Sequence, residues 1–339
     1  MAVAAAAACL SAAGCGADGE PEPPTGPLAE ALAATGGGGA NGSLGFGWAD
    51  PEVADERGLP GHVIASALAP NAGSVILEAK VLERRFGLAP LDATRLTSVA
   101  GSYAFGLRLD GVDGDGLAHA LEKAGASSTL DGDVDLVEAA GYASVPEPLL
   151  EAGVRGLGAF DAVGDDFVVL AISETARATL LGEGDKLLGE PVYAAAARCL
   201  GDVAAARMVP DRQLISTEQG VDLVGVGVRA PGDEVLCTMG GTAERAGEIA
   251  SNLEASLAPD SPDPVSRTPI GDSVESAEVT RDTDGGVEVV EAEVTLAAGE
   301  EPGYLLRAIP QGALVGLIND SGRSFTRKAD SQALARGEN

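Results

Sequence analysis

Ser-Tyr-Ala-Phe-Gly-Leu-Arg-Leu, residues 102–109, is the stretch that decides the fold, because large apolar side chains alternate in it with small or polar ones. A strand sends successive side chains to opposite faces, so one face receives every second residue of the stretch. The residues on that face are Tyr103, Phe105, Leu107 and Leu109. The pattern predicts a strand that packs one face on a core.

Working outward from this strand, further strand and helix patterns follow one another along the chain. Strands are expected at 44–48, 167–172, 203–209, 221–229 and 234–239, with a hairpin of 274–281 and 287–296 around Asp284-Gly285. Helices are expected at 51–69 with a break near Gly58, 74–86, 192–200 and 302–318, and after the capping residues Asp115, Ser173 and Thr242. Hairpins mixed with helices indicate an α+β fold, in which helices pack on one face of antiparallel or mixed sheets.

The charged, glycine-rich segment 182–191 suggests a boundary between two subdomains, residues 43–188 and 189–320. Residues 15–42 are rich in Pro, Gly and Glu and are expected to form a flexible tether, within which 28–34 alone has a helical pattern. Residues 321–339 are expected to be a disordered tail. Both halves contain strand, turn and helix, but no repeated motif establishes a duplication.

The composition limits the classes of partner. The chain has 52 acidic and 22 basic residues and a net charge of -30, so nucleic acid and anionic lipid surfaces would repel it. Solubility is the simple explanation of this charge, and affinity for a cationic partner is the alternative. Aromatic residues make up 3% of the chain, so Ala, Val and Leu must fill the core.

The N-terminus predicts export. Residues 2–10 form an apolar run that is long enough for a secretory signal and too short to span a bilayer. Ala13 and Gly14 before Cys15 resemble the bacterial lipoprotein signal, which implies cleavage after residue 14 and a lipid on Cys15. Cys9 is a second candidate. No basic residue precedes the apolar run, so we expect the true start to lie upstream.

Short motifs extend this resemblance into the body of the chain. Phe86-Gly87-Leu88 with Pro90, Gly111-Val112-Asp113 and Cys199-Leu200-Gly201-Asp202 look like stretches of uncharacterised lipoproteins from actinobacteria. The resemblance implies a place on the outer face of the cytoplasmic membrane, held there by the lipid anchor. It supplies no activity and no catalytic residues.

With Cys9 removed and Cys15 acylated, Cys199 and Cys237 are the two thiols left. An oxidising compartment favours a disulfide between them, which would stabilise the fold by roughly 4 kcal/mol in the chain-entropy model. Two separate buried thiols are the alternative.

The common catalytic patterns are missing from the sequence. It contains no Gly-x-Ser-x-Gly, no Ser-x-x-Lys, no Gly-x-Gly-x-x-Gly after a strand and no phosphate-loop lysine, so we expect no catalytic residues and no cofactor. His62 and His119 lie far apart in the sequence, and structural or surface roles are expected for both. An enzyme without a short motif would have its site near Trp48, Tyr103 and Asp113, at the sheet ends.

One acidic stretch resembles a calcium loop. Asp113, Asp115 and Glu122 match ligand positions of an EF-hand, but Gly111 stands where the first carboxylate belongs. A turn in which Asp115 caps a helix is the preferred interpretation, and the three carboxylates are retained as a weak metal candidate.

These observations favour a non-enzymatic, lipid-anchored surface protein that binds a partner protein or stabilises an envelope assembly. A carrier that holds an apolar small molecule in an internal cavity is the rival hypothesis. An enzyme without a recognisable motif is the third.

Overall fold

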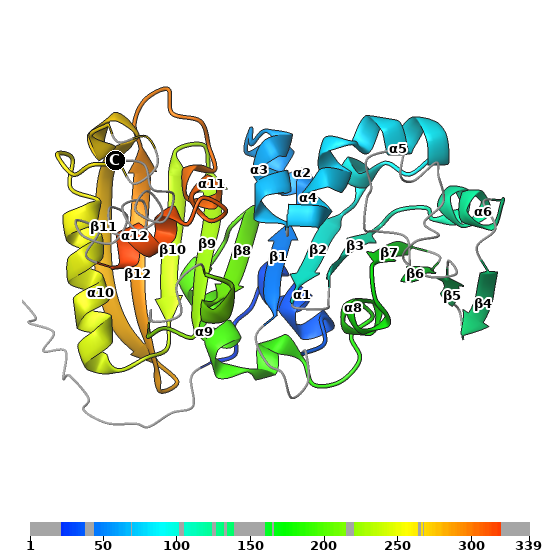
Figure 1. Cartoon of the computed structure of the whole chain (residues 1–339), viewed down its shortest axis with the longest axis horizontal. Coiled ribbons are helices and arrows are strands. Elements are labelled where there is room, and N and C mark those ends of the chain that lie inside the picture. The colour runs from blue at the N-terminus through cyan, green and yellow to red at the C-terminus, as the bar shows by residue number, and fades with distance from the viewer. Residues whose placement is uncertain are drawn as a thin grey trace, which may run out of the picture.

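The computed structural model describes residues 22–37, 44–68, 70–101, 105–123, 127–131, 134–138, 160–164, 166–214, 220–263, 266 and 268–319. Over these residues the strands form one twelve-stranded sheet, and every neighbouring pair is antiparallel. Across Figure 1 the strand order is β11-β12-β10-β9-β8-β1-β2-β3-β7-β6-β5-β4.

The strands fall into two runs of the chain. The first run is β1 (Gly45–Ala49), β2 (Arg95–Ala100), β3 (Phe105–Asp110), β4 (Ser127–Asp131), β5 (Val134–Glu138), β6 (Phe160–Val163) and β7 (Phe167–Ala171). The second run is β8 (Ala205–Pro210), β9 (Leu223–Ala230), β10 (Asp233–Met239), β11 (Val274–Asp284) and β12 (Val287–Leu296).

Helices precede, connect and follow these strands. In the first half they are α1 (Pro27–Ala34), α2 (Pro51–Glu56), α3 (Gly61–Ala67), α4 (Pro70–Leu77), α5 (Ala79–Phe86), α6 (Asp115–Lys123) and α8 (Glu174–Leu180). In the second half they are α9 (Pro191–Leu200), α10 (Ala243–Ser256), α11 (Tyr304–Ala308) and α12 (Ala313–Ile318). Short 3-10 helices include η2 (Pro90–Asp92), η4 (Leu187–Gly189) and η5 (Asp211–Gln213).

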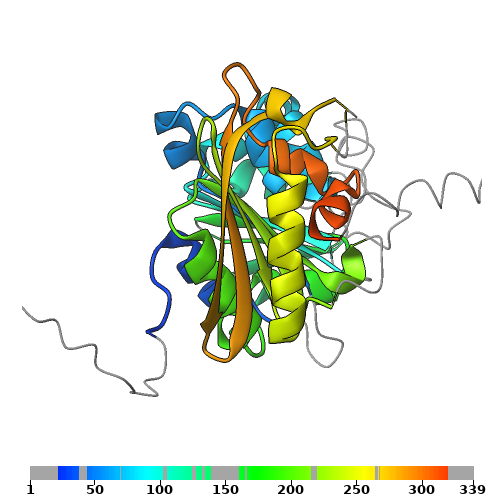
Figure 2. The same ribbon diagram turned by 90° about the vertical axis from the view of Figure 1, so that its left-hand side faces the viewer.

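The structure confirms the predicted α+β class with an antiparallel sheet. Helices cover both faces of the sheet, however, and not one face as expected. In β10, Leu236 packs into the core that contains α3, α10 and α11, whereas Val235 and Cys237 pack with α1 and α9 on the other side. Strands that are apolar on both faces need cover on both. Figure 2 shows α10 against the β11–β12 hairpin, which it contacts.

Part of the expected tether is folded. Residues 27–34 form α1, in which Leu28, Ala29, Ala31 and Leu32 are buried, and the helix contacts α9 and η4. Pro27 occupies the first helical position, where its missing N–H costs no hydrogen bond. The apolar stripe belongs to the same core cluster as Ala195 and Ala196 of α9. A flexible tether therefore does not extend through α1.

The expected subdomains, 43–188 and 189–320, share the sheet, because β1 of the first pairs with β8 of the second. Each half repeats one topology: a helix, a three-strand meander, a connecting helix, and a hairpin whose last strand pairs with the third meander strand. The elements are α1, β1-β2-β3, α6 and β6-β7 in the first half, and α9, β8-β9-β10, α10 and β11-β12 in the second. Antiparallel pairing of the equivalent strands β1 and β8 relates the halves by an approximate two-fold axis normal to the sheet.

The strand with which the sequence analysis began is β3, and its face prediction holds where the structure describes it. Leu107 and Leu109 are fully buried in one core and Phe105 packs against that core, while Tyr103 lies outside the described residues. Ser173 and Thr242 cap α8 and α10 with their side chains, as predicted.

Candidate functional site

A disulfide joins the two cysteines that the sequence paired. Cys199 near the end of α9 and Cys237 in β10 have Cα atoms 6.3 Å apart, and the bond fastens α9 to the sheet. A disulfide is consistent with an extracytoplasmic location. Cys15, the predicted site of lipid attachment, and Cys9 lie outside the described residues.

Two of the three candidate metal ligands, Asp113 and Glu122, have described side chains, whereas that of Asp115 lies outside the described part of the structure. The helix α6 begins at Asp115, so residues 115–122 rise along a helix and carry Glu122 about 10 Å away along its axis. Asp113 and Glu122 are both exposed. In the described part of the chain, no group of three His, Cys, Asp or Glu side chains is placed to hold a metal ion.

The region proposed for a motif-free enzyme has no open site around its tryptophan. Trp48 is 1% exposed and packs with Phe46 and Tyr193 under α1 and α9. Tyr193 donates its hydroxyl to the Leu44 carbonyl, and burial raises its pKa above the ordinary value. These aromatic residues belong to the core.

Of the two histidines, His119 is exposed on α6 and His62 lies on α3 with Nε2 3.4 Å from the Pro302 carbonyl.

The feature most suited to binding is a cleft between α2, the start of α3 and η2, which we call the acidic cleft. Its volume is about 530 Å³, and its lining combines apolar walls with acidic side chains. The lining residues are Pro51, Glu52, Asp55, Leu59, Gly61, Ile64, Leu91, Asp92, Ala93 and Thr94. A hollow of this size holds one or a few side chains of a partner.

Local sequence explains how α2 presents its acids to the cleft. Asp50 caps the helix by accepting a 3.0 Å hydrogen bond from the Val53 N–H, and Pro51 occupies the first helical position. This start leaves Ala54 buried and Glu52 and Asp55 exposed on the cleft side.

The carboxylates of the acidic cleft are not neutralised by the protein. Glu52, Asp55 and Asp92 are all exposed, and in the described residues none of them forms an ion pair or a side-chain hydrogen bond. The nearby Arg57 is already engaged, because its Nη2 lies 2.8 Å from Asp202 Oδ2 and its Nη1 donates to the Arg229 carbonyl. The cleft therefore presents three negative charges that an incoming cation can pair with.

Two leucines add an apolar element to the same side of the molecule. Leu91 of η2 is 43% exposed and lines the cleft, and Leu77 at the end of α4 is 70% exposed. They are the large hydrophobic side chains that stand out as exposed in the described part of the chain. The helix that ends at Leu77, α4, contacts η2, which carries Leu91. Exposed leucines beside a charged cleft are typical of a protein-binding surface.

A second hollow lies on the other face of the sheet. This open groove of about 540 Å³ has a mostly apolar lining and runs past α1, η4 and α9. Its lining residues are Pro23, Pro24, Ala33, Lys186, Leu188, Gly189, Pro191, Ala194, Arg198, Asp284 and Gly285.

Sequence reasoning did not find the acidic cleft. Its two sides come from residues 51–64 and 91–94, and no motif or spacing connects them. Exposed acids are common in a chain of this charge, so the only local signal was Leu91 between a proline and an aspartate in a turn.

Within the described residues, no helix is both long enough and apolar enough to cross a membrane. The chain matches no family model, and comparison with curated proteins and with solved structures returns no significant match.

Proposed function

We propose that the chain is an exported, lipid-anchored binding protein of the cell envelope, and that its acidic cleft receives a basic, partly apolar segment of a partner protein. The observation that carries this proposal is the set of three unpaired carboxylates, Glu52, Asp55 and Asp92, beside exposed Leu91. Apolar contact supplies binding free energy, and the unpaired acids select a cationic partner and speed association.

The cleft favours binding over catalysis. Its acidic groups are carboxylates on exposed positions, the hydroxyl of Thr94 donates to the Asp110 carbonyl, and no histidine, cysteine or serine lines the cleft. The lipid anchor is supported by the sequence pattern at Cys15, and the disulfide agrees with export.

Radioactive palmitate labelling of the full chain in an actinobacterial host tests the anchor. Cys15→Ser should abolish labelling and release the protein from the membrane fraction, whereas the matched Cys9→Ser variant should still be labelled. Labelling that survives in Cys15→Ser would contradict the anchor.

Crosslinking in intact cells tests the cleft. A photo-reactive amino acid in place of Leu91 should yield a crosslinked partner, and the triple variant Glu52→Gln, Asp55→Asn, Asp92→Asn should reduce that product several-fold. The control triple Asp260→Asn, Glu275→Gln, Glu278→Gln removes the same charge from exposed acids elsewhere. An equal yield from the two triples would refute the role of the cleft.

A carrier of an apolar ligand remains a second candidate because of the groove beside α1, which is mostly apolar. Native mass spectrometry of the exported protein tests it. A lipid-sized adduct that disappears in the Ala194→Trp variant would favour the carrier over the partner-binding function.

A further inference from the structure

Arg207 lies in an unusual place for a charged side chain. It belongs to β8, beside the approximate two-fold axis, where it pairs in register with Gly47 of β1 and Val226 of β9. Side chains alternate along the strand, so Ala206 and Met208 face α1 and α9, while Arg207 shares the opposite face with Ala205 and Val209. A guanidinium thus stands within an apolar layer.

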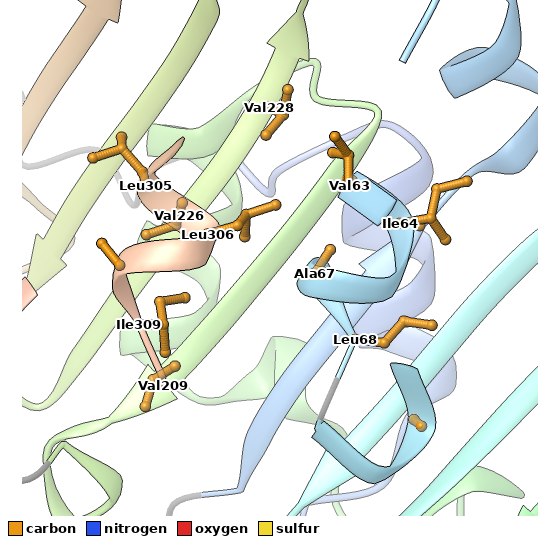
Figure 3. Close-up of a cluster of buried hydrophobic side chains, with 14 of the residues drawn as sticks. Val63, Ile64, Ala67, Leu68, Val209, Val226, Val228, Leu305, Leu306 and Ile309 are labelled. Atoms are coloured by element: carbon orange, nitrogen blue, oxygen red, sulfur yellow. The ribbon is translucent and has the colours of Figure 1, made fainter. Parts of the chain in front are cut away.

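The helices α3 and α11 flank this position. Figure 3 shows Val63 and Ala67 of α3 on the side of that helix toward Leu306 of α11, above β8 and β9. Gly47 lets α3 lie directly on the sheet, because a Cβ there would be 2.5 Å from the Ala67 carbonyl oxygen and 2.9 Å from Leu68 Cα.

Between the two helices is a pocket of about 220 Å³, which we call the Arg207 pocket. Its lining residues are Ala65, Ser66, Leu68, Arg207, Leu306, Arg307, Pro310 and Gln311. Two arginines and no acid line it, although acids outnumber bases by 52 to 22 in the chain. The pocket is therefore basic, whereas the protein as a whole is acidic.

Only one of the two arginines is neutralised by the protein. Arg307 places Nη2 2.8 Å from Glu300 Oε1 and donates Nη1 to the Pro302 carbonyl at 2.8 Å. The side chain of Arg207 is mostly buried and, within the described residues, makes no hydrogen bond or ion pair. Burial lowers the pKa of Arg207 to about 10, so the side chain is still charged at neutral pH. A buried charge without a partner is costly unless a ligand supplies the partner.

We propose that the Arg207 pocket binds a small organic acid, with the carboxylate on Arg207 and the apolar body between Leu68, Leu306 and Pro310. Guanidinium pairs with carboxylate through two parallel hydrogen bonds, and the side-chain amide of Gln311 offers a further donor at the pocket, whereas the Ser66 hydroxyl already donates to the His62 carbonyl. The pocket is smaller than the ~300–1,000 Å³ of sites for drug-sized ligands, so the acid must be small. This site is independent of the acidic cleft.

Calorimetric titration of the full chain, with its disulfide intact, tests the proposal with benzoate, acetate and inorganic phosphate as probes. Benzamide, which has the shape of benzoate without the charge, is the matched control ligand. Benzoate should bind and benzamide should not. Binding of phosphate alone would overturn the assignment to an organic acid, and the absence of binding by all three anions would overturn the site.

Variants locate the binding. Arg207→Gln should weaken benzoate binding by about 10-fold to 100-fold, the loss of a charge-assisted hydrogen-bond pair. Arg212→Gln, which removes an exposed arginine outside the pocket, should leave it unchanged. Equal affinity in the two variants would overturn the proposal. If Arg207→Gln does not fold, Arg207→Lys replaces it. Benzoate should raise the melting temperature of the wild type, and it should raise that of Arg207→Lys less.

Discussion

Glu234 fixes α11 to the sheet. It lies in β10 with 0% exposure, and its carboxylate accepts hydrogen bonds from the N–H groups of Gly303 (2.5 Å), Tyr304 (2.9 Å) and Leu305 (2.8 Å). These are the first amide groups of α11, which have no acceptor within the helix. One buried side chain therefore positions a wall of the Arg207 pocket.

Glu234→Ala should lower the free energy of unfolding by about 3 kcal/mol or more, because three buried N–H groups lose their acceptor at ~1–3 kcal/mol each. Urea denaturation monitored by circular dichroism measures the change. Glu278→Gln, at an exposed position of β11, is the control and should change the value by less than about 0.5 kcal/mol. A similar small effect for Glu234→Ala would contradict the role given to this carboxylate.

Gly47 tests the packing of α3 on β1. In Gly47→Ala the new methyl group would meet the Ala67 carbonyl and Ser98 Oγ at 2.5 Å, so the helix must move away from the sheet. We expect a loss of about 1–3 kcal/mol in urea denaturation. Gly61→Ala is the matched control: no atom lies within 4 Å of its added Cβ, and alanine favours the first turn of α3, so stability should be unchanged or rise by up to about 1 kcal/mol. Equal effects at the two glycines would rule out the close approach.

At the scale of elements, the disulfide joins a helix and a strand that lie 38 residues apart in the sequence. Cys199→Ala with Cys237→Ala should lower stability by about 4 kcal/mol if the constraint on the unfolded chain dominates. Thermal unfolding with and without reductant measures this, and reductant should have no effect on the double variant. A wild type that is insensitive to reductant after unfolding would show that the bond is not formed.

Elements with a regular apolar pattern could be predicted from the sequence, and those without one could not. The hairpin β11–β12, the strands β7 and β10, and the capped helices α8 and α10 all fall where the pattern placed them. The strand β2 was not predicted, because Thr97 and Ser98 interrupt its apolar run, yet both are buried between β1 and β3. The helical pattern at 28–34 did indicate α1, but not its contact with α9, which depends on a segment far along the chain.

Of the candidate sites, the disulfide could be predicted from the sequence, and the two pockets could not. Cys199 and Cys237 could be paired because few other thiols exist, an inference that needs no geometry. The acidic cleft and the Arg207 pocket arise where distant segments meet. Arg207 did leave a trace, a lone charge in the apolar stretch from Ala205 to Val209, but only the sheet shows that this strand is central and covered on both faces.

At the scale of the whole molecule, the repeated topology places Arg207 beside the approximate two-fold axis that relates the two halves. The sequence showed no internal repeat because the helices inserted between β1 and β2, and the extra hairpin β4–β5, have no counterparts in the second half. Core positions also tolerate exchange among Ala, Val and Leu, which removes sequence similarity while the topology is kept.

The net charge of -30 and the buried acids act on stability in the same direction. Burial raises the pKa of four carboxyl groups above their ordinary values: that of Glu234, which is fully buried, and those of Glu190, Asp211 and Glu291, which are half-buried. Through these four groups the folded state binds more protons than the unfolded state as the pH rises above their ordinary pKa values, so they make the free energy of unfolding fall with rising pH. Repulsion among ionised acids on the compact surface adds to the fall.

We therefore expect the protein to be more stable near pH 5 than near pH 7, and added salt to raise its stability at neutral pH by screening the repulsion. Urea denaturation at several pH values and two salt concentrations measures both effects. Glu234→Gln removes the most deeply buried of these acids, so its stability should depend less on pH than that of the wild type, whereas Glu278→Gln should keep the wild-type slope. Stability that rises steadily from pH 5 to pH 7 would mean that paired carboxylates, and not buried or mutually repelling ones, govern the pH dependence of this fold.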